Sequence, residues 1–275
     1  MTTQGEHSGV ILFMSLDIAG STAFKAQAQG GTDSLEWLEA FETFFREVPL
    51  IMMGQIAAAF VMEDEVPDTS VWKVIGDEIV LVAYPKTPRE AELLLLAFYK
   101  TVITYDQKLF EQWPLRLKGC CWAAQISGRN RAIEIPEMLG KDAEDVYVDY
   151  LGPDIDTGFR LAACSGRGQV IVSSNLVHMV SELNSGSGIQ FHYVGRKVLK
   201  GVYSGRPYPL FLMSLSDLMP VTWEWEDDEY FGLNELRRGE PMAPEEICRM
   251  LDQIRGYLNR MCHAGIEKLE FAVRA

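Results

Sequence analysis

Hydrophobic and polar positions follow two periods along this chain, and together these periods predict a mixed set of strands and helices. Short apolar runs, typical of buried strands, cover residues 10–16, 71–75, 78–83, 115–126, 169–172, 191–199 and 208–213. Helical spacing of apolar residues predicts helices over 33–47, 88–112, 153–164, 174–183 and 244–262, and Pro49 is expected to open a further helix through about residue 61. Residues 127–146 are polar and mixed, which indicates a loop or excursion.

The order of these elements is β-α-α-β-β-α-β, followed by smaller helices and strands. It predicts an α/β fold of the α+β kind, a ferredoxin-like sheet covered by helices. After about residue 214 the character changes, and residues 223–230 are acidic and aromatic. We therefore expect one large domain over residues 8–214 and a C-terminal extension over residues 215–275, packed on it or next to it.

Composition narrows the classes of function. The 275 residues are 48% apolar and 23% charged, which suits a globular domain. The formal net charge of −14 repels nucleic acid and anionic membranes, so neither is expected as a partner. The five cysteines form no CxxC pair and the four histidines are scattered, so neither a disulfide framework nor a zinc site is expected. A signal-peptide pattern and a membrane-length apolar run are both lacking, which predicts a cytoplasmic protein.

Two short motifs each place a carboxylate at the end of a predicted strand. Asp17 ends the first apolar run, and Gly20, Ser21 and Thr22 follow it, where backbone N–H groups at a helix start can bind phosphate. Asp77 lies at the tip of the predicted hairpin. Alone, Asp17 could be a helix cap and Asp77 a turn residue. Side by side in one sheet, they would repel each other unless a cation such as Mg²⁺ or Mn²⁺ lay between them.

Four motifs in this order resemble the catalytic domain of class III adenylate/guanylate cyclases. They are Asp-Ile-x-Gly-Ser-Thr from residue 17, Lys-x-x-Gly-Asp from residue 73, an Asp-x-x-Gly segment from residue 149 that continues to an arginine at 160, and Leu-Lys-Gly from residue 199. The likeness covers about residues 8–214. It implies that Asp17 and Asp77 bind two Mn²⁺ or Mg²⁺ ions per site, with the backbone carbonyl of Ile18 assisting one of them.

The same resemblance implies roles for the third motif and for a partner. Lys73 and Asp149 match the two positions that read the base of a nucleoside triphosphate, and Arg160 matches the arginine that stabilises charge on the α-phosphate. The family works as a head-to-tail homodimer, so these residues of one protomer would complete a site whose metals lie on the other. Asp156 stands where the family usually has asparagine, which implies a different substrate pose, a reduced activity or a solvated position without contact.

The base stays open between uracil, cytosine and adenine. Lys73 with Asp149 resembles adenine readers, but one donor beside one acceptor also suits the pyrimidines. Trp72 and Tyr150 flank the pair and either narrow the pocket or pack in the core. A lone catalytic domain with an acidic extension resembles the stand-alone pyrimidine cyclases of Pycsar antiphage systems. This layout favours UTP as the substrate and cyclic UMP as a messenger for a separate effector, with adenylate cyclase as the alternative.

Two further interpretations compete with this one. A diguanylate cyclase shares this kind of sheet, but the full Gly-Gly-Asp-Glu-Phe signature is absent around Asp77. A degenerate domain that only binds nucleotide typically lacks a metal carboxylate, whereas Asp17 and Asp77 are both present. Both facts favour an active nucleotidyl cyclase.

Overall fold

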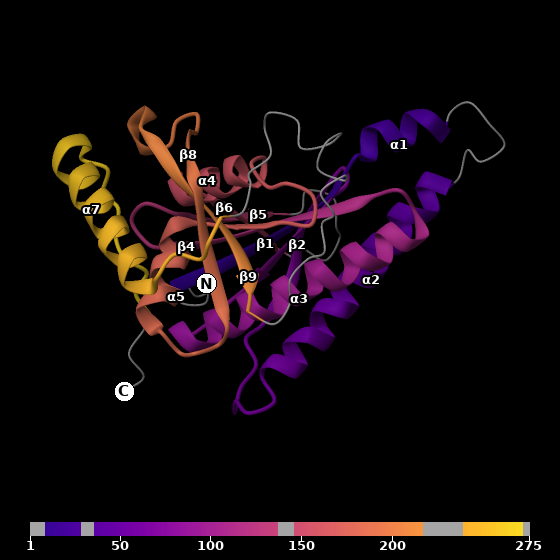
Figure 1. Ribbon diagram of the computed structural model, residues 1–275, viewed down its shortest axis with the longest axis horizontal. Coiled ribbons are helices and arrows are strands. Elements are labelled where there is room, and N and C mark those ends of the chain that lie inside the picture. Colours follow the sequence, from indigo (N-terminus) through magenta and orange to yellow (C-terminus); the bar gives the residue numbers. More distant parts are fainter. Residues whose placement is uncertain (1–8, 29–35, 137–145, 217–238, 272–275) are drawn as a thin grey trace.

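A mixed seven-stranded sheet forms the centre of the molecule in the computed structural model, which describes residues 9–28, 36–136, 146–216 and 239–271 (Figure 1). The strand order is β2-β3-β1-β4-β7-β9-β8. Only β4 and β7 pair in parallel among these neighbours. The strands are β1 (Gly9–Ala19), β2 (Thr69–Ile75), β3 (Glu78–Ala83), β4 (Arg116–Ile126), β7 (Val170–Val172), β8 (Ile189–Val198) and β9 (Pro207–Leu215).

One face of the sheet is covered by long helices. Figure 1 shows α2 (Glu36–Ala59) and α3 (Pro88–Gln112) side by side, with α5 (Ser174–Leu183) and α7 (Pro244–Cys262) at the far end of the molecule from α1 (Ser21–Ala28). Alternate residues of β1 point into this core, which is built from aliphatic and aromatic side chains of the strands and helices. None of the helices in the described part of the chain combines the length and apolarity needed to cross a bilayer.

The other face carries less cover, namely helix α4 (Pro153–Ala162), the short turn η1 (Tyr203–Gly205) and a separate two-stranded sheet of β5 (Arg131–Pro136) and β6 (Val146–Leu151). An aromatic cluster packs beneath them, formed by Phe13, Trp72, Trp122, Tyr150 and Phe159. Because side chains alternate along a strand, Asp17 shares this face of β1 with Phe13. The lightly covered face is therefore the one on which the predicted site lies.

The predicted order β-α-α-β-β-α-β matches the observed order from β1 to β4, but the two helices before β2 are α1 and α2, not the two predicted on either side of Pro49. One local prediction is wrong and another is only partly right. Pro49 does not open a second helix but lies inside α2, because the buried stripe of Phe44, Val48 and Met52 runs straight through it and packing compensates for the missing hydrogen bond. Of the segment 127–146, predicted as a loop or excursion, the described part contains β5, which lies outside the main sheet as an excursion does. Its pairing with β6 supplies hydrogen bonds that polar sequence alone does not reveal.

The C-terminal part of the chain lies against the rest. Helix α7 packs on α5 at the end of the sheet. The predicted boundary near residue 214 falls at the end of β9, and the two-part division stays a prediction. The acidic aromatic segment 223–230 lies outside the described residues.

Candidate functional site

The two predicted metal ligands lie next to each other at one edge of the sheet. Asp17 is near the end of β1 and faces Glu78, the first residue of β3, in the strand register. Asp77 occupies the turn before β3, and its carbonyl accepts a hydrogen bond from the Ile18 N–H at 3.4 Å. The hairpin and the end of β1 therefore bring three carboxylates, those of Asp17, Asp77 and Glu78, to one place.

Burial, together with the neighbouring carboxylates, raises the pKa of two of these carboxyls. Burial raises the pKa of the Asp17 carboxyl, Lys118 counteracts the rise, and Asp77 adds to it by repulsion. Burial also raises the pKa of Glu78, although the Ser15 hydroxyl donates a hydrogen bond to its Oε1 at 2.5 Å. A cation placed among these groups would favour their charged forms.

Lys118 already places a positive charge there, and sequence reasoning missed it. Its Nζ lies 2.7 Å from Asp17 Oδ2, and the side chains of the two residues are 27% and 26% exposed. Lys118 on β4 is the direct register partner of Asp17 on β1. Lys118 could have been identified only from the register between β1 and β4, and no local sequence motif indicates that register.

The carboxylates of Asp17 and Asp77 suit a divalent ion that also takes phosphate and water ligands, and do not suit an ion held by protein side chains alone. Among the described residues, no three His, Cys, Asp or Glu side chains are grouped so as to hold a metal ion by themselves. Mg²⁺, however, commonly uses one or two carboxylates and takes its remaining ligands from substrate phosphates and water. Asp17 and Asp77 match that pattern, so they fit an ion whose remaining ligands are phosphate and water.

A glycine turn places a helix start beside the carboxylates. Gly20 has φ +88°, a conformation that side chains disfavour, and α1 begins at Ser21 directly after β1. The first N–H groups of a helix have no partner within it. Those of Ser21 and Thr22 are such N–H groups, and the binding of phosphate by this segment stays a prediction.

The predicted base-reading pair is brought together within one protomer. Lys73 Nζ on β2 lies 2.7 Å from Asp149 Oδ1 on β6, and it also lies 4.2 Å above the Trp72 ring. The Trp72 Nε1–H donates to the Val148 carbonyl at 3.1 Å and so ties the two strands together. Trp72 and Tyr150 are themselves buried in the aromatic cluster, so they are packing residues and do not narrow an open pocket.

Helix α4 carries the remaining predicted residues. Arg160 Nη1 donates to the carbonyl of Asp156 at 2.8 Å, one turn earlier, and the Asp156 side chain is 70% exposed. Within the described chain, no hydrogen bond or ion pair joins Arg160 to Asp17 or Asp77. A site completed by a second protomer has this property, and the homodimer stays a prediction.

Comparisons with known proteins place this architecture. No family model and no curated protein matches the chain. Solved structures do match: the adenylyl cyclase CyaB from P. aeruginosa aligns with a TM-score of 0.54 at 16% identity, over 76% of this chain and 97% of its own. The guanylate cyclase domain of RhGC from Catenaria anguillulae, solved with GTP, aligns with a TM-score of 0.51 at 12% identity, over 75% and 97%.

The chain has the fold of a nucleotidyl cyclase catalytic domain. The predicted fold class is therefore confirmed. At this level of identity the likeness is one of fold.

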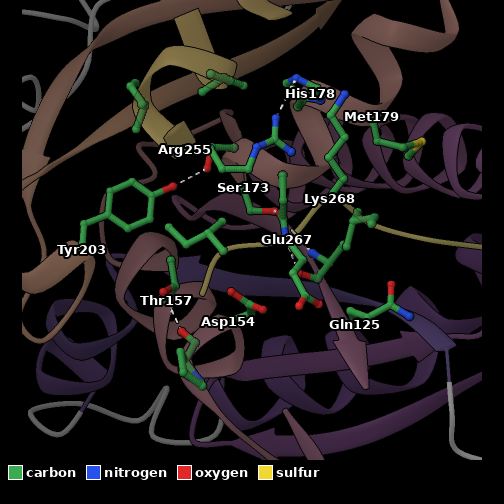
Figure 2. Close-up of a pocket in the computed structure, with 18 of the residues that line it drawn as sticks. Gln125, Asp154, Thr157, Ser173, His178, Met179, Tyr203, Arg255, Glu267 and Lys268 are labelled. Carbon is green, nitrogen blue, oxygen red and sulfur yellow. Dashed lines mark hydrogen bonds between the residues drawn. The ribbon is translucent and has the colours of Figure 1, made fainter. Parts of the chain in front are cut away.

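The structure also has a partly open cavity of about 110 Å³ that lies apart from Asp17 and Asp77. Figure 2 shows it between α4, α5, α7 and the segment that follows α7, and none of the predicted site residues lines it. Arg129 beside it donates to the Gly265 carbonyl at 2.8 Å and lies 3.3 Å from Asp154 Oδ1 in the first turn of α4. The C-terminal segment is thus tied to the helix that carries Arg160.

Proposed function

We propose that this protein is a nucleotidyl cyclase that converts UTP to 3′,5′-cyclic UMP and pyrophosphate. One observation carries the proposal: in a chain with the cyclase fold, Asp17 and Asp77 meet at the end of β1 on the same lightly covered face that carries β6. The Lys73–Asp149 pair, which joins β2 to β6, supports the proposal, because each protomer of a head-to-tail dimer would offer it as a base-recognition element to the metals of its partner.

The chain's own residues account for substrate binding. Asp17 and Asp77 would hold two Mg²⁺ or Mn²⁺ ions, with the Ile18 carbonyl assisting one, and the helix start at Ser21 and Thr22 would hold phosphate oxygens. When bound, such ions stabilise negative charge on attacking and leaving oxygens. The aspartates serve to fix that positive charge at the edge of the sheet.

The reaction needs no protein nucleophile. The ribose 3′ oxygen forms a bond to the α-phosphorus, the bond from that phosphorus to the bridging oxygen breaks, and pyrophosphate leaves with its electron pair. The 3′-hydroxyl proton passes to solvent. Arg160 of a second protomer would stabilise the charge on the α-phosphate, because its own protomer offers it no contact with Asp17 or Asp77.

The Lys73–Asp149 pair supplies one hydrogen-bond donor and one acceptor. Uracil presents a carbonyl oxygen beside a ring N–H, so Lys73 can donate to O4 and Asp149 can accept from N3. Adenine satisfies the same pair with its amino group and ring nitrogen exchanged, which keeps ATP as the second candidate. Of the two substrates we propose UTP, and with it a role in antiviral signalling through a separate effector.

The test is to incubate the purified protein with Mn²⁺ and each of the four ribonucleoside triphosphates, and to identify the products by mass spectrometry. We expect cyclic UMP as the main product. Cyclic AMP as the sole product would replace the UTP assignment by ATP. Linear nucleotides alone, from all four substrates, would overturn the cyclase proposal itself.

A variant test addresses the metal and dimer assignments. Asp77→Ala should abolish turnover and leave the circular dichroism spectrum unchanged, whereas Asp64→Ala, an exposed aspartate in the turn before β2, should retain activity. Mixing inactive Asp77→Ala with inactive Arg160→Ala should restore about a quarter of the wild-type rate, because half of randomly formed dimers are mixed and each has one intact site. Absence of restoration after subunit exchange argues against the shared site.

A further inference from the structure

Lys118 lies among carboxylates that would otherwise repel each other. Its Nζ contacts Asp17 Oδ2 at 2.7 Å, and its charge also acts on Glu78. Asp17 in turn interacts with Asp77. The ammonium group therefore places a positive charge within this cluster in the structure.

The position of Lys118 follows from the strand register. Asp17 and Lys118 are directly opposite each other on β1 and β4, and alternation places both side chains on the face shared by Phe13 and Trp122. The lysine is partly exposed, and its ammonium is a point charge on a flexible four-carbon stem. It can leave Asp17 without any change in the backbone.

A divalent ion needs the same oxygen atoms. Mg²⁺ coordinates carboxylate oxygen at about 2.0–2.1 Å and prefers strict geometry. An ammonium bound to Oδ2 of Asp17 competes for that carboxylate and repels the incoming dication. The nucleotide reverses this balance, because its triphosphate supplies negative charge to both cations.

We propose that Lys118 is an internal cation of the metal site, which occupies Asp17 until a divalent ion displaces it and which thereby makes tight ion binding depend on the nucleotide. This inference rests on the proposed metal-binding role of Asp17 and Asp77. Lys118 lowers the affinity for the ion alone, and once released it lies beside the triphosphate.

The experiment measures Mn²⁺ binding without nucleotide, by isothermal titration calorimetry and by electron paramagnetic resonance of free Mn²⁺. Lys118→Met and Lys118→Gln should bind Mn²⁺ about tenfold more tightly than wild type, which corresponds to about 1.4 kcal/mol. Lys118→Arg keeps the charge and should not gain affinity. Lys108→Met is the matched control, because Lys108 pairs with Glu47 on the helical face and should leave Mn²⁺ affinity unchanged.

Thermal unfolding gives a second measurement of Mn²⁺ binding, which can be made even if one of the variants is less stable than wild type. Without metal, the uncharged variants should melt below wild type, and Mn²⁺ should raise their melting temperature more than it raises that of wild type. Equal or weaker Mn²⁺ affinity in both Lys118→Met and Lys118→Gln overturns the role of Lys118 alone.

Failure of the Lys118 inference can be distinguished from failure of the proposed cyclase reaction. If no variant binds Mn²⁺, with or without a triphosphate, the metal assignment and this inference are both wrong. If the uncharged variants bind Mn²⁺ more tightly but no cyclic nucleotide forms, the inference stands and the proposed reaction fails.

Discussion

Replacing Gly158 by alanine tests how closely α4 packs on the sheet. A Cβ at this position would lie 2.2–2.4 Å from three atoms of the Trp122 indole, more than 1 Å inside an ordinary carbon contact. The indole cannot retreat, because it is 1% exposed and stacked on Phe13 with ring centroids 5.3 Å apart. Helix α4 must therefore move outward by about 1 Å, and overpacking of this size costs about 1–3 kcal/mol.

The assay is thermal and urea unfolding, followed by a cyclase assay. For a chain of this size the melting temperature should fall by about 2–4 °C per kcal/mol, and turnover should fall because Arg160 lies two residues further along the same helix. Gly54→Ala is the matched control: this glycine is exposed in α2 with no atom near its Cβ position, so alanine should stabilise by about 0.5–1 kcal/mol. A Gly158→Ala protein that melts at or above the wild-type temperature would refute the packing argument.

Two more predictions concern the C-terminal half. Burial lowers the pKa of His178 below its ordinary value of 6.5, so below that pH the unfolded chain binds a proton that the folded chain does not. The free energy of unfolding should fall as pH drops below 6.5, and His178→Gln should flatten that slope in urea titrations; parallel slopes would contradict this. The Asn259 side chain exchanges two 2.8 Å hydrogen bonds with the backbone of Ile266. Asn259→Ala should cost about 1–3 kcal/mol and speed amide exchange at Ile266, with Asn259→Asp intermediate; unchanged exchange would show that the segment is held elsewhere.

Helices could be predicted where their ends carry local signals. The bounds of α3, α5 and α7 agree with the sequence because each combines a long apolar stripe with a proline or serine at its start, as at Pro88 and Pro244. Pro49 gave the same helix-start signal, but the prediction was wrong. Burial of the residues on both sides of Pro49 outweighs the local preference of proline for the first turn of a helix. Strand β5 lacked any apolar run, and its pairing with β6 depends on a partner further along the chain.

Some residues of the candidate site could be predicted from local sequence, whereas others depend on how distant strands pair. The meeting of Asp17 with Asp77 could be predicted because each ends an apolar run at a turn, and neighbouring strands bring such ends together. The Lys73–Asp149 contact could be anticipated only through the family resemblance. Lys118 could not be predicted at all, because its role arises from the register of β1 against β4, and a shift by one residue would point it to the opposite face.

The aromatic cluster beneath α4 has an optical consequence. The Lys73 ammonium lies 4.2 Å above the Trp72 ring, and a nearby positive charge alters indole emission. A base that draws Lys73 towards its own carbonyl moves that charge, while Trp122, stacked between Phe13 and α4, responds to displacement of the helix. Intrinsic fluorescence, compared with a Trp72→Phe variant, therefore gives a label-free signal that distinguishes a ligand contact with Lys73 from movement of α4.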